Sequence, residues 1–132
     1  DIHAVMGDGE VGGQGVETAA VATLSVRKVA GLPVPRPYGI QHDRLFVVGW
    51  GDSLASAADR AEADMLSVVA SALDMALPTA RKFLGMAADL RVCWRGGNTP
   101  CMRMELPLAH LPPPVAEAVR RKLGVRDARL WS

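Results

Sequence analysis

The fold is decided by the stretch RLFVVGWGDSLASAADRAEADMLSVVASALDMALP at positions 44–78, where a short apolar run precedes a long helical pattern. Arg44 to Trp50 is apolar on both faces and rich in β-formers, so we expect an interior strand with other elements over each face. From Leu54 to Leu77 apolar residues recur at helical spacing, Ser53 is placed to cap the N-terminus, and Pro78 follows. A helix over 54–77 is therefore predicted to cover the strand.

Downstream of this helix the pattern indicates a second short helix, a hairpin and a final helix. Thr79 to Ala87 has helical spacing directly behind a proline. The runs 90–94 and 102–106 alternate on either side of a Gly- and Pro-containing loop, which is typical of a β-hairpin, and Val115 to Leu123 fits a closing helix. Strands and helices occur without the regular alternation of a parallel sheet. The predicted class is therefore α+β, a mainly antiparallel sheet with a two-helix layer.

Upstream of Arg44 the sequence predicts a loop, a strand and a connection. The first fifteen residues carry five glycines, which is typical of a tightly folded loop. Val16 to Lys28 alternates as a half-buried strand requires. Residues 31–39 contain three prolines, which cannot donate to a sheet ladder, so this stretch is expected to be an extended surface connection that links rather than packs.

The composition describes one globular domain over residues 1–132, with a mass of 14.0 kDa and a formal net charge of +1. A near-neutral balance creates no field that would gather nucleic acid or an anionic membrane, so neither is an expected partner. No apolar run approaches the roughly 20 residues that a membrane helix needs. Cys93 and Cys101 fit neither a metal knuckle nor a dense disulfide framework, which favours a cytoplasmic protein with two reduced, packed cysteines.

The opening loop holds two pairs of polar residues. Asp1 and His3 are two apart, as are Asp8 and Glu10, and in extended geometry residues two apart project to the same side. Imidazole with carboxylate suits a borderline divalent cation, and carboxylates alone suit a hard one. The alternative is a Gly-rich turn whose acids cap exposed N–H groups and whose histidine is merely hydrogen-bonded.

Several motifs resemble those of the acetamidase/formamidase family. The segment Asp1-Ile-His-Ala-Val-Met-Gly-Asp-Gly-Glu10, followed by Gly-Val-Glu at 15–17, is similar to the D-x-H-A-x-[QM]-G-D-G-E segment of that family. Ala88-Asp-Leu-Arg-Val92 resembles its G-D-L-R-[IV] motif with alanine in place of glycine, and Met104-Glu-Leu-Pro107 resembles its closing V-x-L-P. The match runs with little interruption to about Leu111, which makes it more specific than any one motif.

The resemblance implies hydrolysis of short aliphatic amides, such as formamide or acetamide, to a carboxylate and ammonia, with a divalent metal ion in the site. Zinc or calcium is the expected metal. Carried over to this chain, the resemblance places the following residues at or near the site: Asp1, His3, Asp8, Glu10, Glu17 and Asp89. We interpret Asp1 and His3 as metal ligands and Glu10 as the general base. Asp8 is placed to ligate the metal or to orient His3, and Glu17 and Asp89 are supporting carboxylates.

Family members are much longer than this chain, so the resemblance covers the C-terminal half of a larger β-rich fold. Metal ligands usually gather from distant chain segments, and we therefore expect an N-terminal amidase chain, or further copies of this one, to complete the site. Cleavage just before Asp1 would divide one enzyme into two such chains. Two other readings stay open: a non-catalytic metal- or ligand-binding assembly subunit that retains the fold, and a degenerate remnant without metal. The preferred amide is not specified by the sequence.

Overall fold

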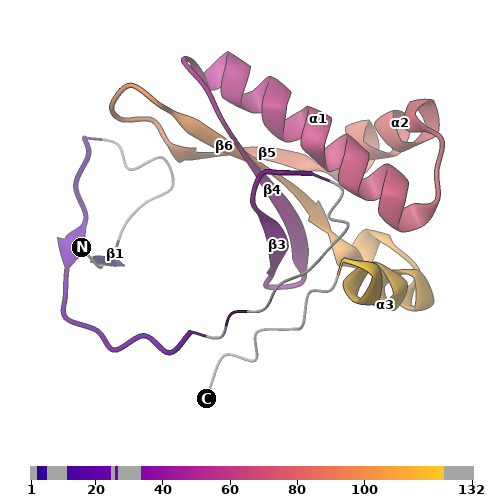
Figure 1. The fold of residues 1–132 in the computed structure, drawn as a ribbon, viewed down its shortest axis with the longest axis horizontal. Helices are drawn as coiled ribbons and strands as arrows, with labels where there is room; N and C mark the ends of the chain where they lie inside the picture. The colour runs from indigo at the N-terminus through magenta and orange to yellow at the C-terminus, as the bar shows by residue number, and fades with distance from the viewer. Residues whose placement is uncertain (1–2, 6–11, 25, 27–33, 124–132) are drawn as a thin grey trace.

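The computed structural model of the chain describes residues 3–5, 12–24, 26 and 34–123. Its centre is a four-stranded antiparallel sheet with the order β3-β4-β6-β5 (Figure 1). The strands are β3 Tyr38–Gln41, β4 Arg44–Trp50, β5 Asp89–Trp94 and β6 Cys101–Pro107. The helices are α1 Leu54–Leu73, α2 Leu77–Ala87 and α3 Pro113–Lys122, with a 3-10 turn at Leu108–His110. The α+β prediction is confirmed, as are the bounds of β4.

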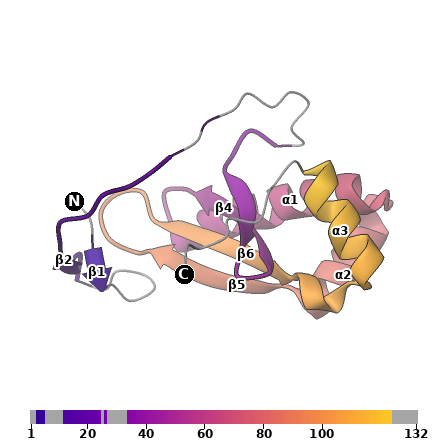
Figure 2. The same ribbon diagram turned by 90° about the horizontal axis from the view of Figure 1, so that it is seen from below.

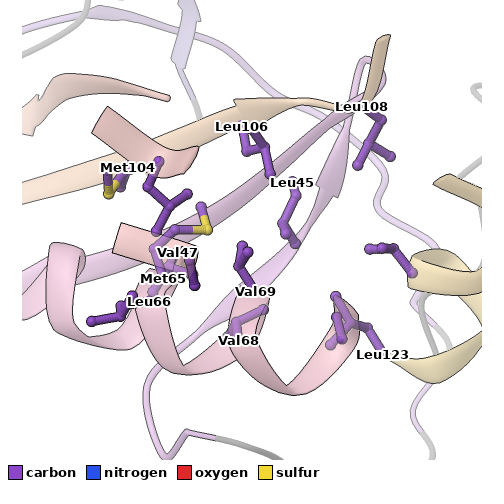
Figure 3. Close-up of a cluster of buried hydrophobic side chains, with 14 of the residues drawn as sticks. Leu45, Val47, Met65, Leu66, Val68, Val69, Met104, Leu106, Leu108 and Leu123 are labelled. Carbon is purple, nitrogen blue, oxygen red and sulfur yellow. The ribbon is translucent and has the colours of Figure 1, made fainter. Parts of the chain in front are cut away.

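Helix α1 lies along one face of the sheet and forms most of the core with it (Figures 1 and 3). Alternate residues of β4 and β6 point to this helix, which gives β4 the pattern of buried Leu45 and Val47 between half-buried neighbours. Gly49 continues that row, and a Cβ there would lie 2.4 Å from the carbonyl oxygen of Ala57. The missing side chain therefore lets helix and strand backbones approach closely.

Helix α1 begins where the sequence predicts and ends earlier. Ser53 is the N-cap, and its side chain accepts a hydrogen bond from the backbone N–H of Ser56. The last helical residue is Leu73, whereas the predicted end is Leu77. Asp74 is the C-cap, and its left-handed backbone conformation, with φ 54°, ends the helix. No single helix in the described ranges is long and apolar enough to cross a membrane. Helices α1 and α2 meet that length and composition only when they are taken together, as a pair bent by 112°.

The opposite face of the sheet carries no helix from the described part of the chain. Phe46 and Val48 point to this face and are half-buried, while Trp50 is 40% exposed. The expectation that β4 is covered on both faces is therefore wrong for the described residues. The pattern was misleading because Arg44, Phe46 and Val48 do not need a covering element. Each is half-buried against side chains of the neighbouring strands within the sheet itself. We name this surface the open face.

The predicted strand over Val16–Lys28 is wrong for residues 18–24, while residues 25, 27 and 28 lie outside the described part. Among the described residues of this range only Val16–Glu17 is a strand, β2, and it pairs with β1, His3–Val5, in a small antiparallel ladder (Figure 2). Residues 18–24 form no regular element and are exposed on both alternating sides; Val21 is 99% and Leu24 85% exposed. A strand needs a neighbour to bond its backbone, and no described segment pairs with residues 18–24.

The proline-rich stretch 31–39 packs more than a surface connection would, although residues 31–33 lie outside the described part. Val34 is in the core, and β3 begins at Tyr38. β3 joins β4 through a two-residue turn in which His42 and Asp43 both have positive φ, 48° and 61°. Such turns match the twist of a hairpin. Such turns usually contain Asn-Gly, so His42-Asp43 carries no recognisable turn signal.

Candidate functional site on the open face of the sheet

Strand register brings charged side chains into two neighbouring rows on the open face. In one row Glu105 of β6 lies between Phe46 of β4 and Asp89 of β5. In the next row Arg103 of β6 lies between Val48 and Arg91. Residues two apart on one strand share a face, so the two rows are adjacent. The ladder thus gathers carboxylates and guanidinium groups from strands that are far apart in the sequence.

Glu105 is the centre of this arrangement, which we name the arginine cluster: Arg44, Arg91, Arg103 and Glu105. The carboxylate accepts a hydrogen bond from Arg103 Nε at 2.5 Å and from Arg91 Nε at 3.0 Å, and Arg44 Nη1 lies 3.5 Å away. Only 9% of the Glu105 side chain is exposed. A buried carboxylate is stable only when it is paired and hydrogen-bonded, and the three guanidinium groups meet that need.

The electrostatics of Glu105 follow from two opposed causes. Burial raises the pKa of Glu105, while the hydrogen bond and charge of Arg103 and the charges of Arg91 and Arg44 lower it. The arginines prevail, and the pKa lies below its ordinary value. Glu105 is therefore ionised at neutral pH, and it is a pairing group rather than a proton donor.

A concavity of about 380 Å³ opens over the cluster. Its lining combines the charged groups with a half-buried apolar wall and a polar rim: Gln41, His42, Arg44, Phe46, Val48, Arg91, Cys93, Arg103 and Glu105. Cys93 of β5 also lines the concavity. It lies where the pairing of β5 with β6 shifts register, between Val92 and Trp94. Burial raises the pKa of the Cys93 thiol to about 11, Cys101 beside it adds to the rise, and Arg103 opposes it. Cys93 is thus a neutral thiol at physiological pH.

The structure tests the predicted loop residues only in part. Asp1, Asp8 and Glu10 lie outside the described residues. The backbone of His3 is placed in β1 directly opposite Glu17 in β2. Two residues that the resemblance assigned to one site are therefore neighbours in the ladder. Among the described residues, no group of three or more His, Cys, Asp or Glu side chains is arranged to hold a metal ion.

Asp89, the remaining predicted residue, lies at the edge of the arginine cluster. Its carboxylate is 3.7 Å from Arg44 Nη1, and its side chain is 60% exposed. Sequence reasoning missed all four members of the arginine cluster as site residues. A signal was present, because Arg103 and Glu105 alternate with apolar Met102, Met104 and Leu106 and so share one face. Their meeting with Arg44 depends on a strand pairing that no local pattern specifies.

The comparisons with known proteins support an acetamidase-like fold. The chain matches no protein-family model and no curated protein. It is similar to the crystal structure of an acetamidase from Bacillus halodurans, with 28% sequence identity and a TM-score of 0.75. The match covers 93% of this chain and 39% of the acetamidase chain. The chain therefore has the fold of part of an acetamidase, and it spans well under half the length of that protein.

Proposed function

We propose that this chain is part of a metal-dependent amidohydrolase that cleaves short aliphatic amides, such as formamide or acetamide, to a carboxylate and ammonia. The observation that carries the proposal is the likeness to an acetamidase, which extends over 93% of this chain at 28% identity. Fold alone does not specify chemistry. The acid- and histidine-containing segment at residues 1–10 adds the required residue types.

The donor chemistry of this N-terminal segment suits a divalent ion. Asp1 and His3 would hold zinc or calcium, and Asp8 would ligate it or orient His3. The pairing of His3 in β1 with Glu17 in β2 supports this assignment, because it places a carboxylate-bearing residue directly opposite the histidine. When bound, the metal would polarise the amide carbonyl and acidify a water molecule.

The residues of the chain would handle the protons. Glu10 would take a proton from the attacking water and deliver it to the amide nitrogen, since this nitrogen must be protonated to leave as ammonia. Glu17 and Asp89 would act as supporting carboxylates, and the Asp89 carboxylate lies 3.7 Å from Arg44 Nη1. The rest of the site would come from an N-terminal amidase chain or from further copies of this chain.

The test is ammonia release from formamide and acetamide by natively purified protein, together with whatever chains accompany it. Native and denaturing mass spectrometry identify those chains first. We expect turnover that a chelator abolishes and added metal restores, and that Glu10→Gln removes. Glu117→Gln is the matched control, because Glu117 is an exposed residue on α3 far along the chain. Metal uptake without turnover in the complete assembly would instead identify a non-catalytic binding subunit.

A further inference from the structure

We propose that strand β5 is the surface through which two copies of this chain pair, with the two β5 strands antiparallel about a two-fold axis at Leu90. The sheets of the two copies would then form one continuous sheet. The inference is argued from the exposure, the order of charges and the open edge of β5, and it does not depend on amide hydrolysis.

β5 is an edge of the sheet, and β6 is its strand neighbour within the described part of the chain (Figure 2). On the other side no described segment pairs with β5, so its backbone N–H and C=O groups are open to a further strand. Natural edges are usually protected by proline, by a bulge or by charges that repel a second copy. In β5 the register shift comes only after Val92, so residues 89–92 form a regular edge without that protection.

The start of β5 exposes apolar surface on the face that the helices cover. Leu90 pairs with the buried Met104 across the ladder, yet 47% of Leu90 is exposed. Met86, next to the end of α2, is 81% exposed. Leu90 and Met104 also line a mainly apolar groove of about 260 Å³ together with Leu84 of α2. Apolar surface gathered beside an open strand edge is typical of an interface.

The order of residues in β5 specifies the register of the pair. A two-fold axis at Leu90 places the Leu90 side chains of the two copies directly opposite each other. Asp89 of each copy then lies opposite Arg91 of the other copy on the open face. Ala88 lies opposite Val92 on the helix-covered face. Apolar residues thus meet apolar residues and acid meets base, whereas an axis at Arg91 would oppose two arginines.

Asp89 and Arg91 can form these pairs in addition to their contacts within the chain. The Asp89 side chain is 60% exposed and lies 3.7 Å from Arg44 Nη1. The Arg91 side chain is 43% exposed, and its Nε donates to Glu105 at 3.0 Å. A guanidinium has enough donors to bond two carboxylates at once. Cross-strand ion pairs contribute modestly, so they select the register, while backbone hydrogen bonds and burial of Leu90 supply most of the affinity.

The first experiment measures self-association of natively purified protein by native mass spectrometry and sedimentation equilibrium. We expect an even number of copies of this chain in each particle, whether or not an N-terminal chain accompanies it. Leu90→Lys opposes two ammonium groups and removes the apolar contact, so the dissociation constant should rise by roughly a hundredfold or more. Leu77→Lys is the matched control, because Leu77 is 55% exposed at the first residue of α2.

An exchange of charges tests the register. Asp89→Arg and Arg91→Asp each bring like charges opposite each other, and each should weaken self-association by roughly tenfold. An equimolar mixture of the two variants should restore it, because every arginine then faces an aspartate. Circular dichroism and the melting temperature show whether each variant is folded, since Arg91→Asp also removes a hydrogen-bond donor to Glu105.

Disulfide trapping tests the same register without a change of charge. In a background of Cys93→Ser and Cys101→Ser, Leu90→Cys should cross-link two copies on mild oxidation, because directly opposite Cβ atoms lie about 4.5–5.5 Å apart. Val92→Cys in that background should not cross-link with its own counterpart, since it faces Ala88 of the other copy.

The proposal is overturned by a single copy of this chain in each particle, or by equal effects of Leu90→Lys and Leu77→Lys. It is also overturned if folded charge variants fail to associate when mixed, or if Val92→Cys cross-links as readily as Leu90→Cys. A cross-link between Leu90→Cys and Val21→Cys in mixed copies would overturn it as well, and would identify the exposed residues 18–24 as the strand that covers β5. None of these readouts uses turnover, so failure of the proposed function and failure of this inference are distinguishable.

Discussion

Arg36 and Asp64 form a two-point ion pair between the segment that precedes β3 and the inward side of α1. Arg36 Nη2 donates to Asp64 Oδ1 at 2.6 Å, and Arg36 Nε donates to Oδ2. Asp64 is buried, at 5% exposed. The hydrogen bond to Asp64 raises the pKa of Arg36, against an opposing effect of burial. This pair fixes the start of the β3–β4 hairpin against the helix.

Removing Arg36 should destabilise the fold strongly. Arg36→Ala leaves the Asp64 carboxylate buried without its partner, and we expect a loss of about 3 kcal/mol in the free energy of unfolding. Arg81→Ala is the control, since its partner Glu62 is solvent-exposed and such pairs contribute about 1 kcal/mol or less. Urea denaturation followed by circular dichroism measures both. Equal losses in the two variants would contradict the assigned role of the Arg36–Asp64 pair.

Two glycines provide a matched pair of alanine substitutions. At Gly49 the new Cβ would lie 2.4 Å from the carbonyl oxygen of Ala57 and 2.5 Å from the nitrogen of Ala61, so α1 must move. We expect Gly49→Ala to cost more than about 2 kcal/mol. At Gly85, within α2, a Cβ would meet nothing within 4 Å, and Gly85→Ala should stabilise by about 0.5–1 kcal/mol. Thermal unfolding distinguishes the two signs.

The sequence allowed β4, α1, α2 and the β5–β6 hairpin to be predicted because their periodicities are local. It could not specify which face of β4 is covered, since its apolar residues lie on both sides. Residues 18–24 alternate like a strand but have no described strand beside them, and pairing is a property of two segments. The meeting of Arg44 with Glu105 is likewise non-local, because the two residues are 61 positions apart.

Glu105 should make stability depend on pH in the acid range. Its folded pKa is below the ordinary value of 4.5, so its contribution is present above that value and is lost as the pH falls through the folded pKa. Glu105→Gln should lower the unfolding free energy at neutral pH, and the difference from the unmodified protein should shrink on acidification. Denaturation at a series of pH values measures this. A difference that is constant with pH would show that the carboxylate charge is not responsible.

Cys93 should react slowly with alkylating agents in the folded protein. A pKa of about 11, raised from 9.0, makes its thiolate about a hundredfold rarer at neutral pH. In the Cys101→Ser variant Cys93 is the remaining thiol, so labelling reports on it alone. Its pKa should stay raised in this variant, because burial is the largest cause of the rise. Iodoacetamide labelling, with and without denaturant, gives the rates. Because the folded pKa is the higher one, the associated stability is present below pH 9 and declines as the pH rises towards 11.

The strand order β3-β4-β6-β5 has a kinetic consequence. The β3–β4 and β5–β6 hairpins each form between neighbours in the chain, whereas the central β4–β6 ladder must close a loop that contains both α1 and α2. Loop closure costs entropy before the new contacts compensate for it, and high contact order slows folding. Docking of the two hairpins is then the slow step. The arginine cluster, which spans β4, β6 and β5, is assembled only at that step.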